Sequence, residues 1–270
     1  MKIYRKNQYD EIKSYLVCYP VNFRITDRNN ESFNKINYEM LYNQYNGFIN
    51  SIVEEGIKPK FIDISDFTQQ IFTRDIGFVI NDLFFICKMN EKCRNGETEP
   101  LKRLLQENNI NYYEMQNNIE GGDLNLHGNE IFVGISSRTT IEAAEELQKV
   151  LDNRKFNIRV VPIYFDSAKL HLDCVFNTLD KDSCVVSPYV YNIDDIELYI
   201  KNIYEITKED ADNLGTNFIY LGKKKLLTSN LRVSKFLKEK GYDTKFIKYD
   251  EVMKAGGSLS CSTLELIREP

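Results

Sequence analysis

Short apolar runs alternate with amphipathic stretches along this chain, and the same order of runs recurs. The first clear case has apolar runs at 78–80 and 83–86 on either side of a two-residue polar turn, a pattern that is typical of a β-hairpin. Residues 97–106 then carry leucines at helical spacing, and an apolar run at 110–113 predicts a further strand. The unit is therefore hairpin, helix and strand.

Three further stretches repeat this order. Their hairpins are predicted at 124–133, 175–186 and 218–228. The helices that follow are predicted at 139–151, 195–204 and 230–237. Thr139 and Glu142 form a capping box for the first of these helices, and Asn230 can cap the last. The closing strands of the second and fourth units are predicted at 158–161 and 245–247.

A fifth unit joins the two ends of the chain. It begins at Cys261, continues with an alternating strand at 264–267, and is completed by a strand at 14–19, a helix at 38–55 and a strand at 61–64. The unit starts are 43 to 51 residues apart, and such a near-constant period indicates a closed repeat architecture. We therefore predict one α/β domain over 1–270, a ring of five ββαβ modules, rather than a generic α/β sandwich with accidental spacing.

Composition narrows the class of protein. The hydrophobic fraction of 42% and the charged fraction of 28% are ordinary for a soluble globular protein. The net charge of -5, with Lys and Arg scattered along the chain, argues against a nucleic-acid partner. No apolar stretch reaches the roughly 20 residues of a membrane span, and the first residues show no secretory signal. We therefore expect a cytoplasmic protein.

Six cysteines and two histidines limit the chemistry of the chain. No C-x-x-C pair is present, so we expect neither disulfides nor a structural zinc site. Cys93 lies in a polar turn and is expected at the surface, and His127, in a hairpin turn, is expected to be exposed and structural. The cysteines expected to be inert core residues lie in apolar runs: Cys18, Cys87, Cys174 and Cys184.

Residues with reactive or charged side chains recur just before the first strand of the units. Asp75 precedes the first unit and Glu120 the second, His171 and Asp173 precede the third, and Cys261 stands at the head of the fifth. Equivalent positions in a ring lie near its axis and at one end. We therefore expect these side chains to meet in one cavity.

The stretch 256–263 presents Cys261 among glycines and small residues, which leaves its sulfur uncrowded. A thiolate needs a nearby general acid or base, and His171 is the candidate. Carboxylates around one cavity repel one another unless a cation lies between them. A planar guanidinium pairs with carboxylates and offers an electrophilic carbon. Ordinary roles stay open: Asp75 paired with Arg74, Glu120 in a turn, and His171 hydrogen-bonded in the core.

Five motifs, taken in order, resemble those of the guanidino-group-modifying enzymes. This superfamily includes arginine deiminase, dimethylarginine dimethylaminohydrolase, the dihydrolases and the amidinotransferases. The motifs are FTRD at 72–75, EGGD at 120–123, VGISSRT at 133–139, HLD at 171–173 and GGSLSC at 256–261. The resemblance implies a five-bladed α/β propeller (pentein) and hydrolysis of a guanidinium group through a covalent thiouronium adduct.

The resemblance also implies a role for each residue. Cys261 would attack the guanidinium carbon, and His171 would protonate the departing amine and then activate water. Glu120 would orient these groups and balance their charge, whereas Asp75 and Asp173 would bind guanidinium nitrogens. The residues implied for the amino-acid end of the substrate are Arg138, Arg94 and, where the family has Asn or Asp, Gln69.

We therefore expect a guanidine hydrolase that needs no cofactor or metal and acts on a small-molecule guanidino substrate. Arginine giving citrulline and ammonia is favoured, because a second carboxylate, Asp173, suits unsubstituted N–H donors. The alternatives are dimethylarginine hydrolysis, a dihydrolase forming ornithine, an amidinotransferase, or an inactive guanidino-binding module. The oligomeric state is open, with a homodimer among the options, as is whether the polar loop 22–37, with Asn29 and Asn30, covers the cavity.

Overall fold

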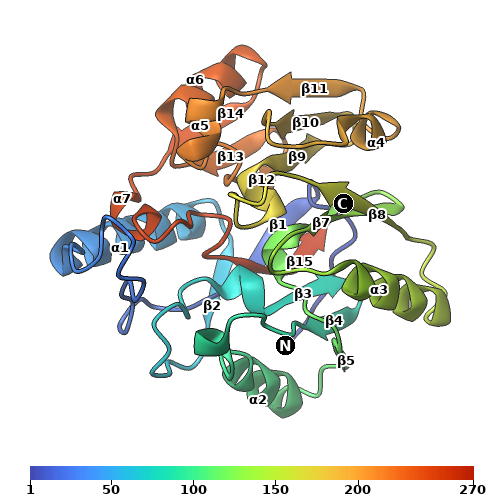
Figure 1. Ribbon diagram of the computed structural model, residues 1–270, viewed down its shortest axis with the longest axis horizontal. Helices are drawn as coiled ribbons and strands as arrows, with labels where there is room; N and C mark the ends of the chain where they lie inside the picture. The colour runs from blue at the N-terminus through green and yellow to red at the C-terminus, as the bar shows by residue number, and fades with distance from the viewer.

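Five small sheets arranged around a centre make up the fold of this protein (Figure 1). The structure, a computed structural model, describes all residues from 1 to 270. Every sheet has three strands in the same arrangement: the first pairs antiparallel with the second, and the second pairs parallel with the third. The repeat predicted from the hydrophobic pattern is therefore confirmed.

Each unit has its main helix between the second and third strands. The units are β3 (Gly77–Ile80), β4 (Leu83–Ile86), α2 (Glu99–Glu107) and β5 (Tyr112–Glu114); β6 (Leu124–His127), β7 (Glu130–Ile135), α3 (Ile141–Asn153) and β8 (Arg159–Tyr164); β9 (Phe176–Asp180), β10 (Ser183–Val186), α4 (Ile193–Glu197) and β11 (Asn202–Glu205); β12 (Ile219–Gly222), β13 (Lys225–Thr228), α6 (Leu231–Glu239) and β14 (Asp243–Phe246); and β15 (Leu264–Glu269), β1 (Glu11–Val17), α1 (Tyr38–Glu54) and β2 (Lys58–Phe61). Two short helices, which the sequence did not predict, connect units: α5 (Lys208–Asp212) and α7 (Asp250–Met253). None of the helices has the length and apolar character that crossing a membrane would require.

The two ends of the chain meet in the fifth sheet. Strand β15 pairs antiparallel with β1, from Glu269 opposite Glu11 to Leu264 opposite Leu16, and β1 pairs parallel with β2. The last unit is thus completed by the N-terminal part of the chain, as predicted. This pairing closes the ring and fixes the position of Cys261, which lies three residues before β15.

Buried ionic contacts reinforce this closure. Glu265 on β15 lies 2.6 Å from Arg5, 2.7 Å from Arg268 and 3.7 Å from Arg74, and all four side chains are buried. Burial raises the pKa of Glu265, but the charges of the three arginines outweigh it and lower that pKa to about 2. The carboxylate therefore stays ionised and links the N-terminal segment, β15 and the segment before β3.

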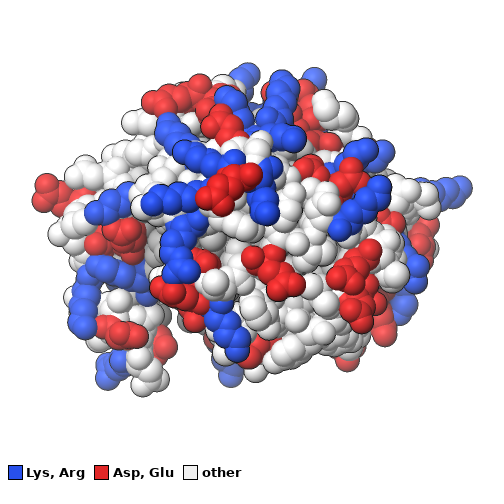
Figure 2. Space-filling view, turned by 90° about the horizontal axis from the view of Figure 1, so that it is seen from above, with Lys and Arg blue, Asp and Glu red and all other residues white.

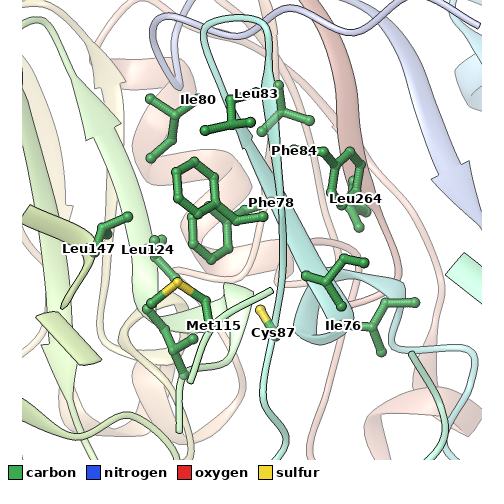
Figure 3. Close-up of a cluster of buried hydrophobic side chains, with 14 of the residues drawn as sticks. Ile76, Phe78, Ile80, Leu83, Phe84, Cys87, Met115, Leu124, Leu147 and Leu264 are labelled. Carbon is green, nitrogen blue, oxygen red and sulfur yellow. The ribbon is translucent and has the colours of Figure 1, made fainter. Parts of the chain in front are cut away.

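Apolar faces of neighbouring units pack directly on one another (Figure 3). Phe78 of β3 stacks on Phe85 of β4 with ring centroids 4.9 Å apart. The same cluster takes in Leu124 and Leu147 from the second unit and Leu264 from β15. Because side chains from three units share one cluster, burial of this apolar surface holds the blades in place relative to one another.

Several predicted elements differ from the structure at their ends, and two of them show the physical reason. Strand β2 lies at Lys58–Phe61, three residues earlier than predicted, because its parallel register places Phe61 beside Val17 of β1. In the third unit α4 ends at Glu197, and residues 202–204, the end of the predicted helix, lie in β11 (202–205) instead. Pairing with β10 is available there, and a tertiary contact of this kind overrides a weak helical pattern.

The capping prediction for α3 is wrong by one residue. Thr140, and not Thr139, is the N-cap, and its hydroxyl accepts a hydrogen bond from Ala143 N. Thr139 is fully buried, and its Oγ accepts a hydrogen bond from Glu120 N at 3.1 Å. Asn230 caps α6 as predicted. Thr139 is therefore tied to the segment that carries Glu120.

His127 is buried, contrary to the expectation that it is exposed. Only 4% of it is accessible, and its ring packs against Tyr9 at 5.4 Å and Phe132 at 5.9 Å between centroids. The N-terminal segment covers this hairpin turn, as the hydrogen bond from Gly128 N to Asn7 shows. Because the covering segment is distant in sequence, the local pattern could not reveal it.

The surface carries charges of both signs. On the face shown in Figure 2, Lys and Arg side chains are interspersed with Asp and Glu and do not form one basic patch. Cys93 is exposed, and the four cysteines in apolar runs are buried, as the runs around them predicted. Cys261 is buried as well.

Two glycines give a matched test of this packing. Nothing lies within 4 Å of a Cβ added to Gly47 on the exposed side of α1, so Gly47→Ala should raise the free energy of unfolding by about 0.5–1 kcal/mol. A Cβ on Gly121 would lie 2.1 Å from the backbone oxygen of Arg74, so Gly121→Ala should lower it by about 1–3 kcal/mol. Urea unfolding measures both, and a neutral Gly121→Ala would contradict this close backbone approach.

Candidate active site

Three single 3-10 turns place the polar groups of the site. They are η1 (Thr73–Ile76), η3 (Gly121–Asp123) and η4 (Leu172–Cys174), which come just before β3, β6 and β9. Turn η3 packs against both of the others. These turns carry or adjoin Asp75, Glu120, His171 and Asp173. Gly122 makes room for this arrangement, because a Cβ there would lie 2.7 Å from His171 Nδ1.

A cavity of about 210 Å³ lies beside these turns. Six of the residues predicted from the sequence line it: Gln69, Asp75, Arg94, Arg138, His171 and Cys261. Glu120 and Asp173 are not among the lining residues. The ring thus brings the nucleophile and acid/base candidates into one cavity, although they are 90 positions apart in the chain.

The imidazole of His171 lies between two carboxylates. Its Nε2 is 2.9 Å from Glu120 Oε2, and its Nδ1 is 3.7 Å from Asp75 Oδ1. Burial lowers the pKa of His171, but the charge of Asp75 and the hydrogen bond with Glu120 outweigh it and raise that pKa to about 10. Burial raises the pKa of Glu120, but the bond to His171 and nearby arginine charges lower it to about 2. His171 therefore carries a proton at neutral pH.

Arg94 is engaged with the protein's own carboxylates. Its Nη1 lies 2.6 Å from Asp75 Oδ2 and 3.7 Å from Glu120, and its Nε donates to Glu97 at 2.8 Å. The guanidinium is buried. The predicted role of Arg94 in binding a substrate carboxylate gains no support from this geometry, because a second anion would have to compete with Asp75 and Glu97.

The same cluster has the donor types of a metal site. Ligand atoms of Asp75, Glu120 and His171 lie within 4.8 Å of one another. The guanidinium of Arg94 already contacts both carboxylates, and His171 adds a second positive charge. These two cations balance the carboxylates, so charge balance alone does not call for a metal ion here.

The surroundings of Cys261 were only partly foreseen. Asp173 Oδ2 lies 3.9 Å from the sulfur and accepts a hydrogen bond from Ser260 Oγ at 3.0 Å, with Arg74 Nε 3.8 Å away. The other carboxylate oxygen of Asp173, Oδ1, lies 3.6 Å from the thiol sulfur of Cys174. Burial raises the pKa of Asp173, and the charge of Arg74 opposes this only in part. Asp173 therefore contacts the sulfur without lining the cavity, and its predicted contact with a guanidinium gains no support.

Asn217 is a site residue that the sequence analysis missed. Its Nδ2 donates a hydrogen bond to Cys261 Sγ at 3.1 Å. It lies two residues before β12, which is the repeat position that Asp75 occupies before β3. The fourth unit therefore also places a site residue just before its first strand. Asn217 was missed from the sequence because only charged or reactive side chains were sought at this position.

The polar loop 22–37 covers one side of the cavity. Five of its residues line the cavity: Arg24, Ile25, Thr26, Asp27 and Asn30. Asn30 Nδ2 donates to Lys254 O at 3.1 Å, and Lys254 Nζ donates back to Lys35 O at 2.9 Å. The loop is thus fastened to the segment that follows α7. Length and polarity had suggested such a cover, but the lining residues were not foreseen.

The guanidinium of Arg138 is partly accessible to solvent. Its side chain is 16% accessible and lies 3.5 Å from Glu120 and 3.6 Å from Glu91. These contacts are longer than those of Arg94, so Arg138 is the more available cation of the pair for an anionic ligand in the cavity.

Sequence comparison places this chain among known guanidino-modifying proteins. A family model for arginine deiminase matches residues 49–226. YkgA, an uncharacterized protein of Bacillus subtilis (strain 168), is 30% identical over 97% of this chain and 94% of its own length. N(G),N(G)-dimethylarginine dimethylaminohydrolase of Pseudomonas aeruginosa is 21% identical over 85% of this chain and 90% of its length.

A solved structure supports the fold. The N-terminal domain of ArgZ, an arginine dihydrolase from Cyanobacteria, matches with a TM-score of 0.85 at 22% identity, over 94% of this chain and 98% of that chain. This likeness, with the five equivalent sheets, confirms the five-bladed α/β propeller. The family model covers well over half of the residues, so this chain belongs to the arginine deiminase family.

Proposed function

We propose that this protein is a cysteine-dependent guanidine hydrolase whose first substrate is arginine. The observation that supports this most directly is a pair of buried atoms without hydrogen-bond partners, Asp75 Oδ1 and His171 Nδ1. Both residues line the cavity together with Cys261. Buried polar groups are normally paired. A guanidinium would supply an N–H donor for Asp75, and once the sulfur has added to its carbon, the departing nitrogen can accept the proton of His171.

The reaction follows from these positions. The thiolate of Cys261 adds to the guanidinium carbon and forms a C–S bond. His171 gives its proton to the departing nitrogen, the C–N bond breaks, and ammonia leaves a thiouronium adduct on the sulfur. His171, now neutral, takes a proton from water, whose oxygen adds to the same carbon. The C–S bond then breaks as the hydroxyl group of the adduct gives up its proton, which the released ammonia takes up as ammonium, and this step frees the thiolate and citrulline.

Other groups in the cavity suit an amino-acid substrate. Arg24 and Arg138 provide positive charge for a carboxylate, and Asp27 provides negative charge for an α-ammonium group. The arginine deiminase family model supports arginine as the substrate. Dimethylarginine is the first alternative, because Asp173, the carboxylate expected to select unsubstituted nitrogens, does not line the cavity. A dihydrolase reaction that continues to ornithine is the second, given the likeness to ArgZ.

Turnover assays distinguish these reactions. The purified chain should convert arginine to a ureido product and ammonia, with little ornithine, and should act more slowly on dimethylarginine. Cys261→Ala should lose turnover by the several orders of magnitude that a missing nucleophile costs. The matched control Cys93→Ala removes the exposed thiol and should leave turnover unchanged. Equal rates in the Cys261→Ala protein, or no reaction with any guanidine, would contradict the proposal.

Arg138 gives a test of the substrate's carboxylate end. Arg138→Ala should weaken arginine binding at least about tenfold, since a charge-assisted hydrogen bond contributes about 1.5–3 kcal/mol. The control Arg232→Ala removes an exposed arginine that pairs with Glu209 on the surface and should change neither KM nor kcat. Agmatine, which lacks the carboxylate, should bind both variants alike. Unchanged arginine affinity in Arg138→Ala would rule out this contact.

The proton on His171 has a measurable consequence for stability. Its folded pKa of about 10 lies above the ordinary 6.5, so its stabilisation is complete below pH 6.5 and is lost as pH rises towards 10. Burial lowers the pKa of His127, so the opposite holds there: its stabilisation is complete above pH 6.5 and is lost as pH falls.

Thermal unfolding of three proteins across the pH range tests this. His171→Gln should flatten the fall in unfolding temperature above pH 6.5, whereas His127→Gln should flatten the fall below pH 6.5. An unchanged alkaline slope in His171→Gln would show that His171 is neutral in the folded protein and would remove it as the proton donor.

A further inference from the structure

Asn217 contacts the reacting atom of the site. Its Nδ2 lies 3.1 Å from Cys261 Sγ, and its Oδ1 accepts hydrogen bonds from Ser260 N at 3.1 Å and Cys261 N at 3.3 Å. The side chain is fully buried. One carboxamide therefore holds both the backbone and the sulfur of the nucleophile.

The chemistry of these contacts fixes the orientation of the amide. Backbone N–H groups can only donate, so the atom that meets Ser260 N and Cys261 N must be the oxygen. The amide nitrogen must then point at the sulfur. A thiolate can accept this hydrogen bond, and the deprotonated sulfur is the better acceptor of the two forms. The bond therefore favours the anionic form of the nucleophile.

A buried network holds Asn217 in place. Asn177 Nδ2 donates to Thr216 O and Phe218 O, the two carbonyls that flank Asn217, both at 3.0 Å. Asn177 Oδ1 in turn accepts from Asn125 Nδ2 at 3.1 Å. The amide is therefore preorganised on three neighbouring units, β6, β9 and β12, before any substrate enters.

Other titratable groups surround the sulfur and set the background against which Asn217 acts. Asp173 lies 3.9 Å away and opposes a negative charge on the sulfur. The thiol of Cys174 adjoins both Asp173 and Cys261, and its contact with Cys261 and its burial raise its pKa, so this thiol stays neutral. Asp75, His171 and Arg94 line the same cavity as Cys261. Tyr249 reaches Ser262 through its hydroxyl at 3.1 Å. Of the groups that touch the sulfur itself, Asn217 alone presents a donor that cannot lose its proton.

We propose that Asn217 is a catalytic residue of this site, which stabilises the thiolate of Cys261 by donating an amide hydrogen bond to the sulfur and aims it by holding the backbone at 260–261. This role rests on the proposed function of Cys261 as nucleophile. It adds a group from the fourth unit to a site otherwise drawn from the first, second, third and fifth.

Alkylation by iodoacetamide tests this without any substrate. In a Cys93→Ser background, which removes the exposed thiol, the rate of Cys261 alkylation is followed against pH by peptide mass spectrometry. Asn217→Asp keeps an oxygen for the two backbone donors but loses the N–H groups. The midpoint of its rate profile should move up by at least about one to two pH units, because the sulfur loses a hydrogen bond and a negative charge is added beside it.

Two further variants complete the experiment. Asn217→Leu removes both the hydrogen-bond donor and the acceptor while keeping a side chain of similar size, and it should also raise the midpoint of the rate profile. This variant therefore tests the role of Asn217 even if the Asp variant does not fold. Asn230→Asp makes the same change at another buried asparagine, which caps α6 and has no contact with Cys261, and should leave the midpoint in place. Cooperative thermal unfolding confirms that each protein is folded.

The outcomes separate this role from the proposed function. An upward shift in the Asn217 variants and none in Asn230→Asp supports the role, whether or not the protein turns over arginine. Midpoints that stay within about 0.3 pH units of the parent, or an equal shift in Asn230→Asp, would overturn it. If the parent protein does not turn over arginine, the proposed substrate is contradicted, but the conclusion from the alkylation rates still holds.

Discussion

Pairing of β15 with β1 is the contact on which the site depends. It is made between the last and the first strands of the chain, and it fixes the strand that follows Cys261. Buried ion pairs of Glu265 with three arginines secure the same junction. Without this closure the fifth blade would lack two of its three strands, and the sulfur would have no defined position opposite His171.

Charge balance is the second constraint on the site. Asp75 and Glu120 are buried together, and two neighbouring carboxylates can stay ionised only beside buried cations. Arg94 and protonated His171 supply that charge. As a result one oxygen of Asp75 is engaged and the other is left without a partner. The network thereby reserves a single acceptor for a ligand, close to the imidazole that can donate a proton.

Pseudo-symmetry explains why distant residues converge. Each unit delivers a side chain from the segment just before its first strand, and the ring turns these equivalent positions towards one centre. The rule correctly grouped Asp75, His171 and Cys261 from their spacing alone. It also holds for Asn217, although a neutral amide carries no signal of catalytic chemistry in a sequence. The resemblance of five motifs pointed to the same family that the comparisons show.

Sequence by itself determined the five repeats, the meeting of the chain ends and six of the residues that line the cavity. These follow from local periodicity and from motifs, which are properties of short segments. Only the tertiary structure decided which way each side chain faces. It turned Asp173 behind the sulfur, paired Arg94 with Asp75 and Glu97, buried His127 under Tyr9, and set Asn217 against Cys261. Those outcomes depend on contacts between segments far apart in the chain, and no local pattern records them.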